Sequence, residues 1–164
     1  MITSFEELGL IEPLRRALSA EKYLRPTPIQ AKAIPVLRDG KDLLGIAETG
    51  SGKTAAFALP ILHRLAERDA QRMSGTRQAL ILAPRRELAG QICDRFRAYG
   101  RALPLRTLAI FGGVSQFHQV KALKAGVDVL IATPLRLLDL CNQRHVRLDQ
   151  VSILVLDEAV RMLD

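Results

Sequence analysis

The feature that most constrains this chain is a glycine-rich stretch, Ala47-Glu48-Thr49-Gly50-Ser51-Gly52-Lys53-Thr54, that follows an apolar run and precedes a helix-like segment. Residues 43–46 predict a strand and residues 55–65 predict a helix. A strand, a glycine-rich turn and a helix in this order predict a phosphate-binding loop, because glycines let successive backbone N–H groups point at a phosphate. Lys53 would bring a positive charge to the β- and γ-phosphates, and Thr54 would offer its hydroxyl to Mg²⁺. The stretch departs from the strict pattern at Ala47, where glycine is usual, and the alternative is an ordinary Gly/Ser turn before a helix. We expect a nucleotide-binding protein.

Apolar segments alternate with helix-like segments through the rest of the chain. The expected strands are 79–83, 105–111, 127–132 and 151–156, and the expected helices are 10–20, 27–37, 87–99, one capped by Ser115, and one capped by Thr133 that runs to residue 141. Residues 71–78 read as a polar connection and are expected to be the most mobile part of the chain. Unbroken apolar strands separated by helices predict an α/β fold with a parallel sheet covered on both faces.

Right-handed crossovers place the C-terminal ends of all parallel strands at one edge of the sheet, where ligands bind. The special segments expected there are the phosphate loop, Pro84-Arg85-Arg86, Gly112-Gly113, Thr133-Pro134 and Asp157-Glu158. Asp157, at the end of an apolar strand, is well placed to hold Mg²⁺ through water, and Glu158 could accept a proton from an attacking water. The alternative for this pair is an acidic helix N-terminus, which the helix dipole favours.

Composition and charge narrow the class of protein. The 164 residues suggest one domain, and a net charge of +7 favours a polyanionic partner, although a solvated basic surface is the alternative. Cys93 and Cys141 stand alone and have no metal or redox spacing, which indicates a reducing compartment. The start of the chain lacks the features of a signal peptide, and no apolar run reaches the ~18 residues that span a bilayer. We expect a cytoplasmic protein with no membrane partner.

A series of short motifs follows one another in a specific order. They are Phe5, Pro26-Thr27-Pro28-Ile29-Gln30, Ala47 to Thr54, Pro84-Arg85-Arg86-Glu87-Leu88-Ala89, Gly112-Gly113, Thr133-Pro134-Leu135-Arg136 and Asp157-Glu158-Ala159-Val160. This order resembles that of the DEAD-box ATP-dependent RNA helicases, over nearly the whole chain. Residues 112–116 and 161–164 look most like the bacterial RhlE-like branch. The resemblance implies that residues 1–164 form an N-terminal RecA-like ATP-binding domain that is incomplete at its C-terminus, with a Q-motif region at 1–40 and a phosphate-loop core at 41–164.

The resemblance implies an ATP site and an RNA path, carried over residue by residue. Phe5 would stack on adenine, Gln30 would read the N6 and N7 edge of the base, and Thr27 would support the phosphate loop. The other residues expected to bind ATP or ADP are Arg25, Thr49, Gly50, Ser51, Gly52, Lys53 and Thr54. Lys53, Asp157 and Glu158 would be catalytic, with Thr54 and Asp157 on the Mg²⁺. The sugar-phosphate backbone of RNA would lie across Arg86, Gly112, Gly113, Thr133 and Arg136.

The chain also departs from the family pattern. Arg85, Leu135 and Val160 stand where Thr, Gly and Asp are usual, and Arg85 removes an expected helix N-cap at a cost of about 1 kcal/mol. The resemblance implies a further strand between the phosphate-loop strand and the acidic strand, and a second RecA-like domain that supplies arginines; this sequence contains neither. We expect the chain alone to bind nucleotide and RNA without unwinding, and to self-associate through its incomplete sheet.

Two other functions stay open on the sequence alone. A degenerate nucleotide- or RNA-binding module without turnover would agree with the three altered motif positions. A small-molecule phosphotransferase would also carry a phosphate loop, but that class places the loop near the N-terminus and has an Arg-bearing lid. The stretch from Phe5 to Gln30 that precedes the loop argues against it.

Overall fold

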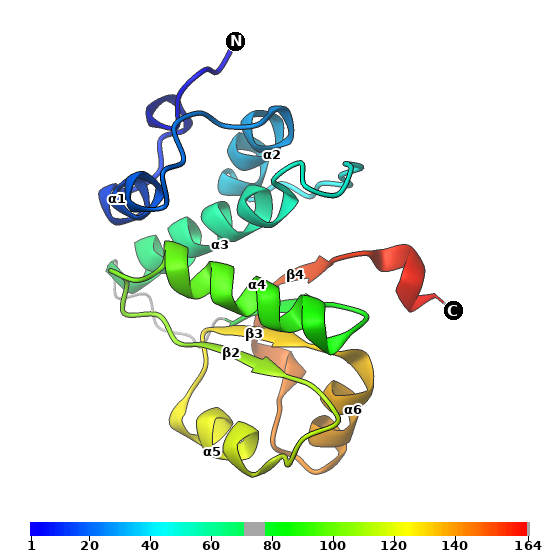
Figure 1. The fold of residues 1–164 in the computed structure, drawn as a ribbon. Coiled ribbons are helices and arrows are strands. Elements are labelled where there is room, and N and C mark those ends of the chain that lie inside the picture. The colour runs from blue at the N-terminus through cyan, green and yellow to red at the C-terminus, as the bar shows by residue number, and fades with distance from the viewer. Residues whose placement is uncertain (71–77, 164) are drawn as a thin grey trace. The chain divides into compact units, whose positions relative to one another are not determined.

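The computed structural model describes residues 1–70 and 78–163 (Figure 1). In chain order the helices, 3₁₀ helices (η) and strands are η1 (Glu6–Leu8), α1 (Glu12–Ala20), α2 (Pro28–Arg38), α3 (Lys53–Ala70), β1 (Gln78–Leu82), α4 (Arg86–Tyr99), β2 (Thr107–Ile110), α5 (Phe117–Ala125), β3 (Val129–Ala132), α6 (Pro134–Asn142), η2 (Leu148–Gln150), β4 (Val151–Leu156) and η3 (Ala159–Met162). The connection predicted at 71–78 lies outside the described residues except for Gln78, which begins β1. None of the described helices is long and apolar enough to cross a membrane.

Tertiary contacts divide the chain into two compact units. Unit 1 comprises Met1–Met73 and Arg95–Pro104, and unit 2 comprises Ser74–Asp94 and Leu105–Asp164. The candidate residues for nucleotide binding, from Phe5 to Thr54, therefore belong to unit 1. The acidic pair and the candidate RNA-binding residues belong to unit 2.

Unit 1 is helical. Helix α1 has a proline in its first turn and buries the face formed by Leu14, Ala17 and Leu18, as an amphipathic helix does. Helix α2 begins at Pro28 after Thr27, whose backbone is extended, and it packs against α3. The side chains of α3 that are buried are small or aliphatic in its first half, which permits close helix packing. Tyr23 and Tyr99 join the end of α1 to the end of α4 through a hydrogen bond between their hydroxyls of 3.0 Å.

Unit 2 contains a four-stranded parallel sheet in the order β2-β3-β1-β4. One face packs on α5 and α6 in an apolar core, which contains Leu80, Ile110, Leu130, Ala132, Leu137, Leu140 and Val146. The unit 2 part of α4 lies on the opposite side of the sheet from these two helices (Figure 1). The predicted α/β fold with a parallel sheet and helices on both faces is thereby confirmed.

Strand β4 ends the sheet. It pairs with β1 along one edge, and the other edge has no strand partner among the residues described. Leu154 and Leu156 lie in register with Leu80 and Leu82, on the face that α5 and α6 cover elsewhere, yet they are 57% and 51% exposed. The last strand of the sheet therefore presents both a free edge and an exposed apolar face.

The strand predicted at 43–46 is wrong. Residues 41–48 have no regular structure, and Leu44 and Ile46 are 91% and 92% exposed. An apolar run becomes a strand only where a neighbour accepts and donates its backbone hydrogen bonds, and none of the four strands of the sheet does so here. The predicted cap of α5 is also shifted by one residue, because Gln116 occupies the N-cap position while Ser115 Oγ accepts a hydrogen bond from Phe117 N–H at 3.3 Å.

Candidate functional site

The phosphate loop is formed by two glycines with left-handed backbone and the start of α3. Gly50 and Gly52 have φ values of +80° and +86°, a conformation that costs little only for glycine. The turn is closed by Ser51, whose N–H donates to the carbonyl of Glu48 at 3.2 Å. Helix α3 then begins at Lys53, so the first backbone N–H groups of the helix have no partner within it and are available to a phosphate. The lysine and Thr54, at the first two positions of α3, are half-buried.

Gln30 connects the Q-motif helix to the phosphate loop. Its side chain is 4% exposed; Oε1 accepts a hydrogen bond from Thr27 N–H at 3.0 Å, and Nε2 donates to the carbonyl of Gly52 at 3.2 Å. One backbone partner is a donor and the other an acceptor, so the orientation of the amide is fixed. The amide keeps one N–H and one lone pair, which is the pair of groups needed to read an adenine edge.

Gly52 is the position where the loop and α2 come closest. A Cβ at this position would overlap Nε2 of Gln30 and would lie 3.0 Å from Oγ1 of Thr27. That hydroxyl is buried and faces the backbone N–H of Gln30 in a capping box, but it makes no hydrogen bond of good geometry among the described residues. A buried hydroxyl with a weak partner, next to a glycine cradle, fits a site that is completed by a bound polar group.

The remaining candidates of unit 1 differ in exposure. Phe5 precedes η1 and is 7% exposed, so most of its ring is packed in the protein, whereas Arg25 is exposed. Thr49 and Gly50 are exposed at the tip of the loop, and Ser51 is half-buried. The assignments of these residues to the base and phosphates remain predictions.

Asp157 and Glu158 follow β4 directly. The N–H of Asp157 donates to the carbonyl of Leu82 at 2.9 Å, which extends the pairing of β4 with β1 by one residue. Oδ1 of Asp157 accepts the N–H of Glu158 at 3.0 Å, and Glu158 has a left-handed backbone with φ of 49°. The acidic pair therefore sits in a tight turn at the carboxyl end of the sheet, as expected for strands that all run parallel.

The carboxylate of Glu158 is paired with two arginines. Arg85 Nη2 lies 3.4 Å from Oε1, and Arg161 Nε lies 3.5 Å from Oε2. This pair was not predicted from the sequence. It depends on the pairing of β1 with β4, whose ends are in register at Leu82 and Leu156 and are followed by Arg85 and Glu158.

The candidate RNA-binding residues also follow strand ends. Arg86 opens α4 after β1, Gly112 and Gly113 follow β2, and Thr133 follows β3 and forms the N-cap of α6. Gly113 has φ of +81°, and a Cβ there would lie 2.9 Å from Nη1 of Arg86. Arg86 and the glycine turn are thus neighbours, and both are open to solvent.

Arg136 occupies a different position from Arg86. Its Nη1 donates to Oε1 of the buried Gln119 at 3.0 Å, and its Nη2 donates to the carbonyl of Val114 at 3.0 Å. Gln119 in turn donates to the carbonyl of Phe111 at 3.1 Å. The guanidinium therefore connects α6 to the segment from Phe111 to Val114, and through these hydrogen bonds it fixes the glycine turn that lies within that segment.

The side chains present fit a magnesium nucleotide better than a bare metal ion. No group of three His, Cys, Asp or Glu side chains suited to a metal occurs among the described residues. Mg²⁺ is commonly held by one or two protein oxygens together with substrate phosphates and water. Thr54 of unit 1 and Asp157 of unit 2 remain the protein ligands predicted from the sequence, and each prediction stands by itself.

Comparisons with known proteins place the chain in a family. The profile of the DEAD/DEAH box helicase family matches residues 27–164. The chain is 49% identical over 162 residues to the ATP-dependent rRNA helicase RRP3 of Pyricularia oryzae, covering 98% of this chain and 29% of that protein. It is 42% identical to the ATP-dependent RNA helicase DDX42 of Xenopus laevis, covering 100% of this chain and 17% of that protein.

A solved structure agrees with the sequence comparisons. The crystal structure of a hypothetical ATP-dependent RNA helicase from Sulfolobus tokodaii is similar with a TM-score of 0.84 and 32% identity, over 94% of this chain and 43% of that chain. The chain thus spans less than half of that solved chain and about a third or less of these curated relatives. With its RecA-like α/β fold and a profile match over most of its length, the chain belongs to the DEAD/DEAH box helicase family.

Proposed function

We propose that this chain is the ATP-binding part of an ATP-dependent RNA helicase. Unit 1 binds ATP or ADP with Mg²⁺, and unit 2 binds the RNA backbone. The observation that carries the proposal is the buried Gln30 amide, which joins Thr27 N–H to the carbonyl of Gly52 and so ties a base-reading residue to the phosphate loop. Lys53 and Thr54 follow that loop directly, at the start of α3.

Each candidate residue has a role that agrees with its chemistry. Lys53 offers a charge to the phosphates, and Glu158 is the carboxylate that orients the hydrolytic water. Arg86 and the backbone at Gly112, Gly113 and Thr133 contact RNA phosphates, and such contacts carry no sequence information. Binding to RNA is therefore expected to be sequence-independent and sensitive to salt.

The proposal separates binding from unwinding. Strand separation in this family would need a second RecA-like domain, whose arginines can be worth about 10³-fold or more in phosphoryl transfer. The 164-residue chain alone is therefore expected to bind nucleotide and RNA, but RNA binding is not expected to stimulate ATP hydrolysis or to lead to strand separation. The RhlE-like branch and a cytoplasmic location are finer parts of the proposal, the second supported by two free cysteines, Cys93 and Cys141.

A degenerate module without turnover is the second candidate. It is favoured by the two arginines that surround the Glu158 carboxylate, because a base that is engaged in two ion pairs is less available to water. The phosphotransferase alternative is set aside because the chain belongs to the helicase family.

The experiment that tests the proposal is ATP turnover with and without single-stranded RNA at low salt. The Lys53→Ala variant serves as the blank, because it keeps the fold of the loop but lacks the phosphate-binding charge. We expect RNA to bind without stimulating hydrolysis. A several-fold stimulation of ATP hydrolysis by RNA in this chain alone would contradict the proposal that the chain binds RNA without coupling that binding to hydrolysis.

A further inference from the structure

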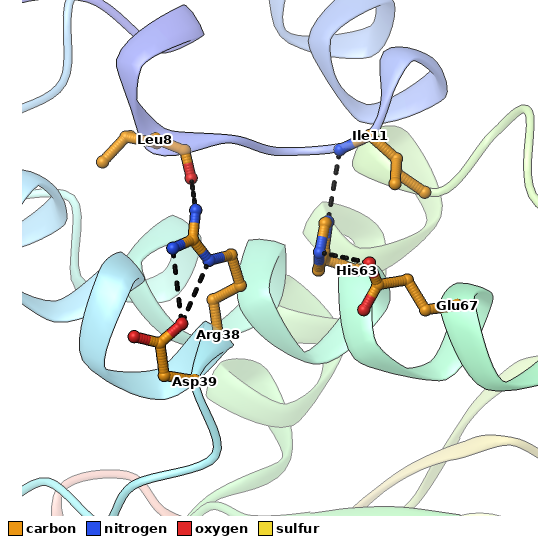
Figure 2. A network of polar contacts seen from close by, with 6 residues as sticks. All are labelled: Leu8, Ile11, Arg38, Asp39, His63 and Glu67. Carbon is orange, nitrogen blue, oxygen red and sulfur yellow. Dashed lines mark hydrogen bonds and ion pairs between the residues drawn. The ribbon is translucent and has the colours of Figure 1, made fainter.

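A polar network in unit 1 anchors the segment that carries Phe5 (Figure 2). His63 of α3 accepts a hydrogen bond at Nδ1 from the backbone N–H of Ile11 at 3.2 Å, and its Nε2 lies 3.2 Å from Oε1 of Glu67. Arg38, at the end of α2, donates to the carbonyl of Leu8 and pairs with Asp39 at 3.3 Å. Two side chains from two helices thus hold the backbone on either side of Gly9.

The segment held by this network is internally ordered. Oε1 of Glu7 accepts hydrogen bonds from the N–H groups of Thr3 and Ser4, at 3.1 Å each, and Phe5 accepts the N–H of Leu8 at 3.2 Å. Hydrogen bonds on both sides of Phe5 therefore join it to its neighbours within residues 3–8. Its position relative to the phosphate loop depends on the contacts that fix Leu8 and Ile11.

The two anchoring helices are the same two that build the nucleotide site. Helix α3 begins with Lys53 and Thr54 and carries His63 further along, whereas α2 begins beside Thr27 and ends at Arg38. The start of α3 would hold the phosphates, and the start of α2 would support the loop and read the base through Thr27 and Gln30. The more C-terminal residues His63 and Arg38 would hold the base-stacking segment. A rigid connection between the two ends is what a base-selective site needs.

We infer that His63 and Arg38 are positioning residues that set the contribution of the adenine base to nucleotide affinity, and that His63 acts only as a neutral imidazole. The inference rests on the proposed function together with the role that the family resemblance implies for Phe5, which is to stack on adenine. It goes beyond that function because neither His63 nor Arg38 is among the residues proposed to contact the nucleotide. Nδ1 must stay unprotonated to accept the Ile11 N–H, and protonation would leave two donors facing each other.

The charges around His63 agree with this requirement. Burial lowers the pKa of His63, Glu67 on its own helix raises it, and Arg38 on α2 lowers it further. The segment from Leu8 to Ile11 offers only backbone and apolar groups. Because the folded pKa lies below the usual 6.5, the imidazole is neutral and the anchor complete above that pH. The anchor is lost as the pH falls below 6.5 and through the lowered pKa.

The test compares affinities for MgADP and for the magnesium complex of ribose 5-diphosphate, which has the same phosphates and no base, between pH 8 and pH 5. Three variants are needed. In His63→Asn, Oδ1 can replace Nδ1 as a non-titrating acceptor; His63→Leu removes the acceptor; and His118→Asn is a matched control at an exposed histidine of unit 2. Circular dichroism at each pH checks that the chain stays folded.

We divide the ADP affinity of each protein by that of His63→Asn at the same pH. For the wild type and for His118→Asn, this ratio should fall about two- to tenfold between pH 8 and pH 5, which is the range for one net hydrogen bond. Affinity for ribose 5-diphosphate relative to His63→Asn should not change with pH. His63→Leu should bind ADP at pH 8 as weakly as the acidified wild type does, and His63→Asn should restore binding.

The outcomes separate the inference from the proposed function. If ADP binds better than ribose 5-diphosphate but the ratio of wild-type to His63→Asn affinity is the same at both pH values, the positioning role is overturned while the proposed function stands. If the wild type binds both ligands equally at pH 8, the adenine contact itself is absent and both are overturned. Equal loss of the two ligands in His63→Leu would indicate a purely structural role and would also overturn the inference.

Discussion

Replacement of Gly52 by alanine tests how tightly the phosphate loop is joined to the Q-motif helix. The φ of +86° at this residue is unfavourable for any L side chain, and the new Cβ would overlap Nε2 of Gln30. The amide of Gln30 would have to move, which breaks its hydrogen bonds to Gly52 and Thr27. Gly50→Ala is the matched control, because its φ is +80° and the space around its Cβ is open.

The two substitutions share a left-handed backbone and differ in the contacts with Gln30 and Thr27, so their costs can be compared. The left-handed backbone should cost about 1 kcal/mol of unfolding free energy at either position. Loss of the two hydrogen bonds of the buried amide adds about 1 kcal/mol each at Gly52. We therefore expect Gly50→Ala to lower the unfolding free energy by about 1 kcal/mol and Gly52→Ala by about 3 kcal/mol.

Urea unfolding followed by circular dichroism measures these changes, provided that the slope of the transition is unaltered. In a Gln30→Ala background the amide is already absent, so Gly52→Ala should cost only about 1 kcal/mol more. Equal costs for Gly50→Ala and Gly52→Ala, or an unchanged cost in the Gln30→Ala background, would refute the inferred contact.

Four further substitutions have expected outcomes. Arg85→Thr should leave the unfolding free energy unchanged or raise it by up to about 1 kcal/mol in thermal unfolding, because a restored N-cap offsets the loss of a partly exposed ion pair with Glu158. A decrease of more than about 1 kcal/mol would show that the ion pair contributes more than the cap. Arg136→Ala should lower the unfolding free energy by about 1–3 kcal/mol through its two internal hydrogen bonds. Arg86→Ala should instead leave the unfolding free energy within about 0.5 kcal/mol and reduce the salt slope of RNA binding by about one. If the two variants behaved alike, the distinction between a structural Arg136 and an RNA-binding Arg86 would be wrong. Leu154→Lys on the free edge of β4 should reduce self-association in sedimentation, whereas a wild-type chain that is monomeric at all concentrations would contradict the exposed-edge argument.

The parts of the fold that depend on local signals were predicted from the sequence. Pro28 after Thr27 predicted the start of α2, and the apolar run from Val151 to Leu156 predicted β4 with its observed bounds. These signals act within a few residues of the element that they specify. The alternation of strands and helices then sufficed for a parallel sheet, whose carboxyl ends carry four of the five expected segments.

The parts that depend on distant residues were not predicted. Residues 43–46 are as apolar as a strand, but a strand needs a paired neighbour, and its presence cannot be read from the run itself. The pair between Arg85 and Glu158 joins residues 73 positions apart, and the His63 anchor joins residues 52 positions apart. Such contacts depend on how elements pack against one another, and nothing within a few residues of His63 or Arg85 specifies these partners.

Calorimetric titration of the chain with MgADP and MgGDP tests the central claim most directly. Gln30 keeps one donor and one acceptor that match adenine, and guanine presents the opposite pattern, so a mismatch should cost a few kcal/mol. We expect ADP to bind more tightly than GDP, Gln30→Ala to narrow the difference, and Lys53→Ala to weaken both. Equal affinities of the wild-type chain for ADP and GDP would contradict the claim that the Gln30 amide reads the base beside the phosphate loop.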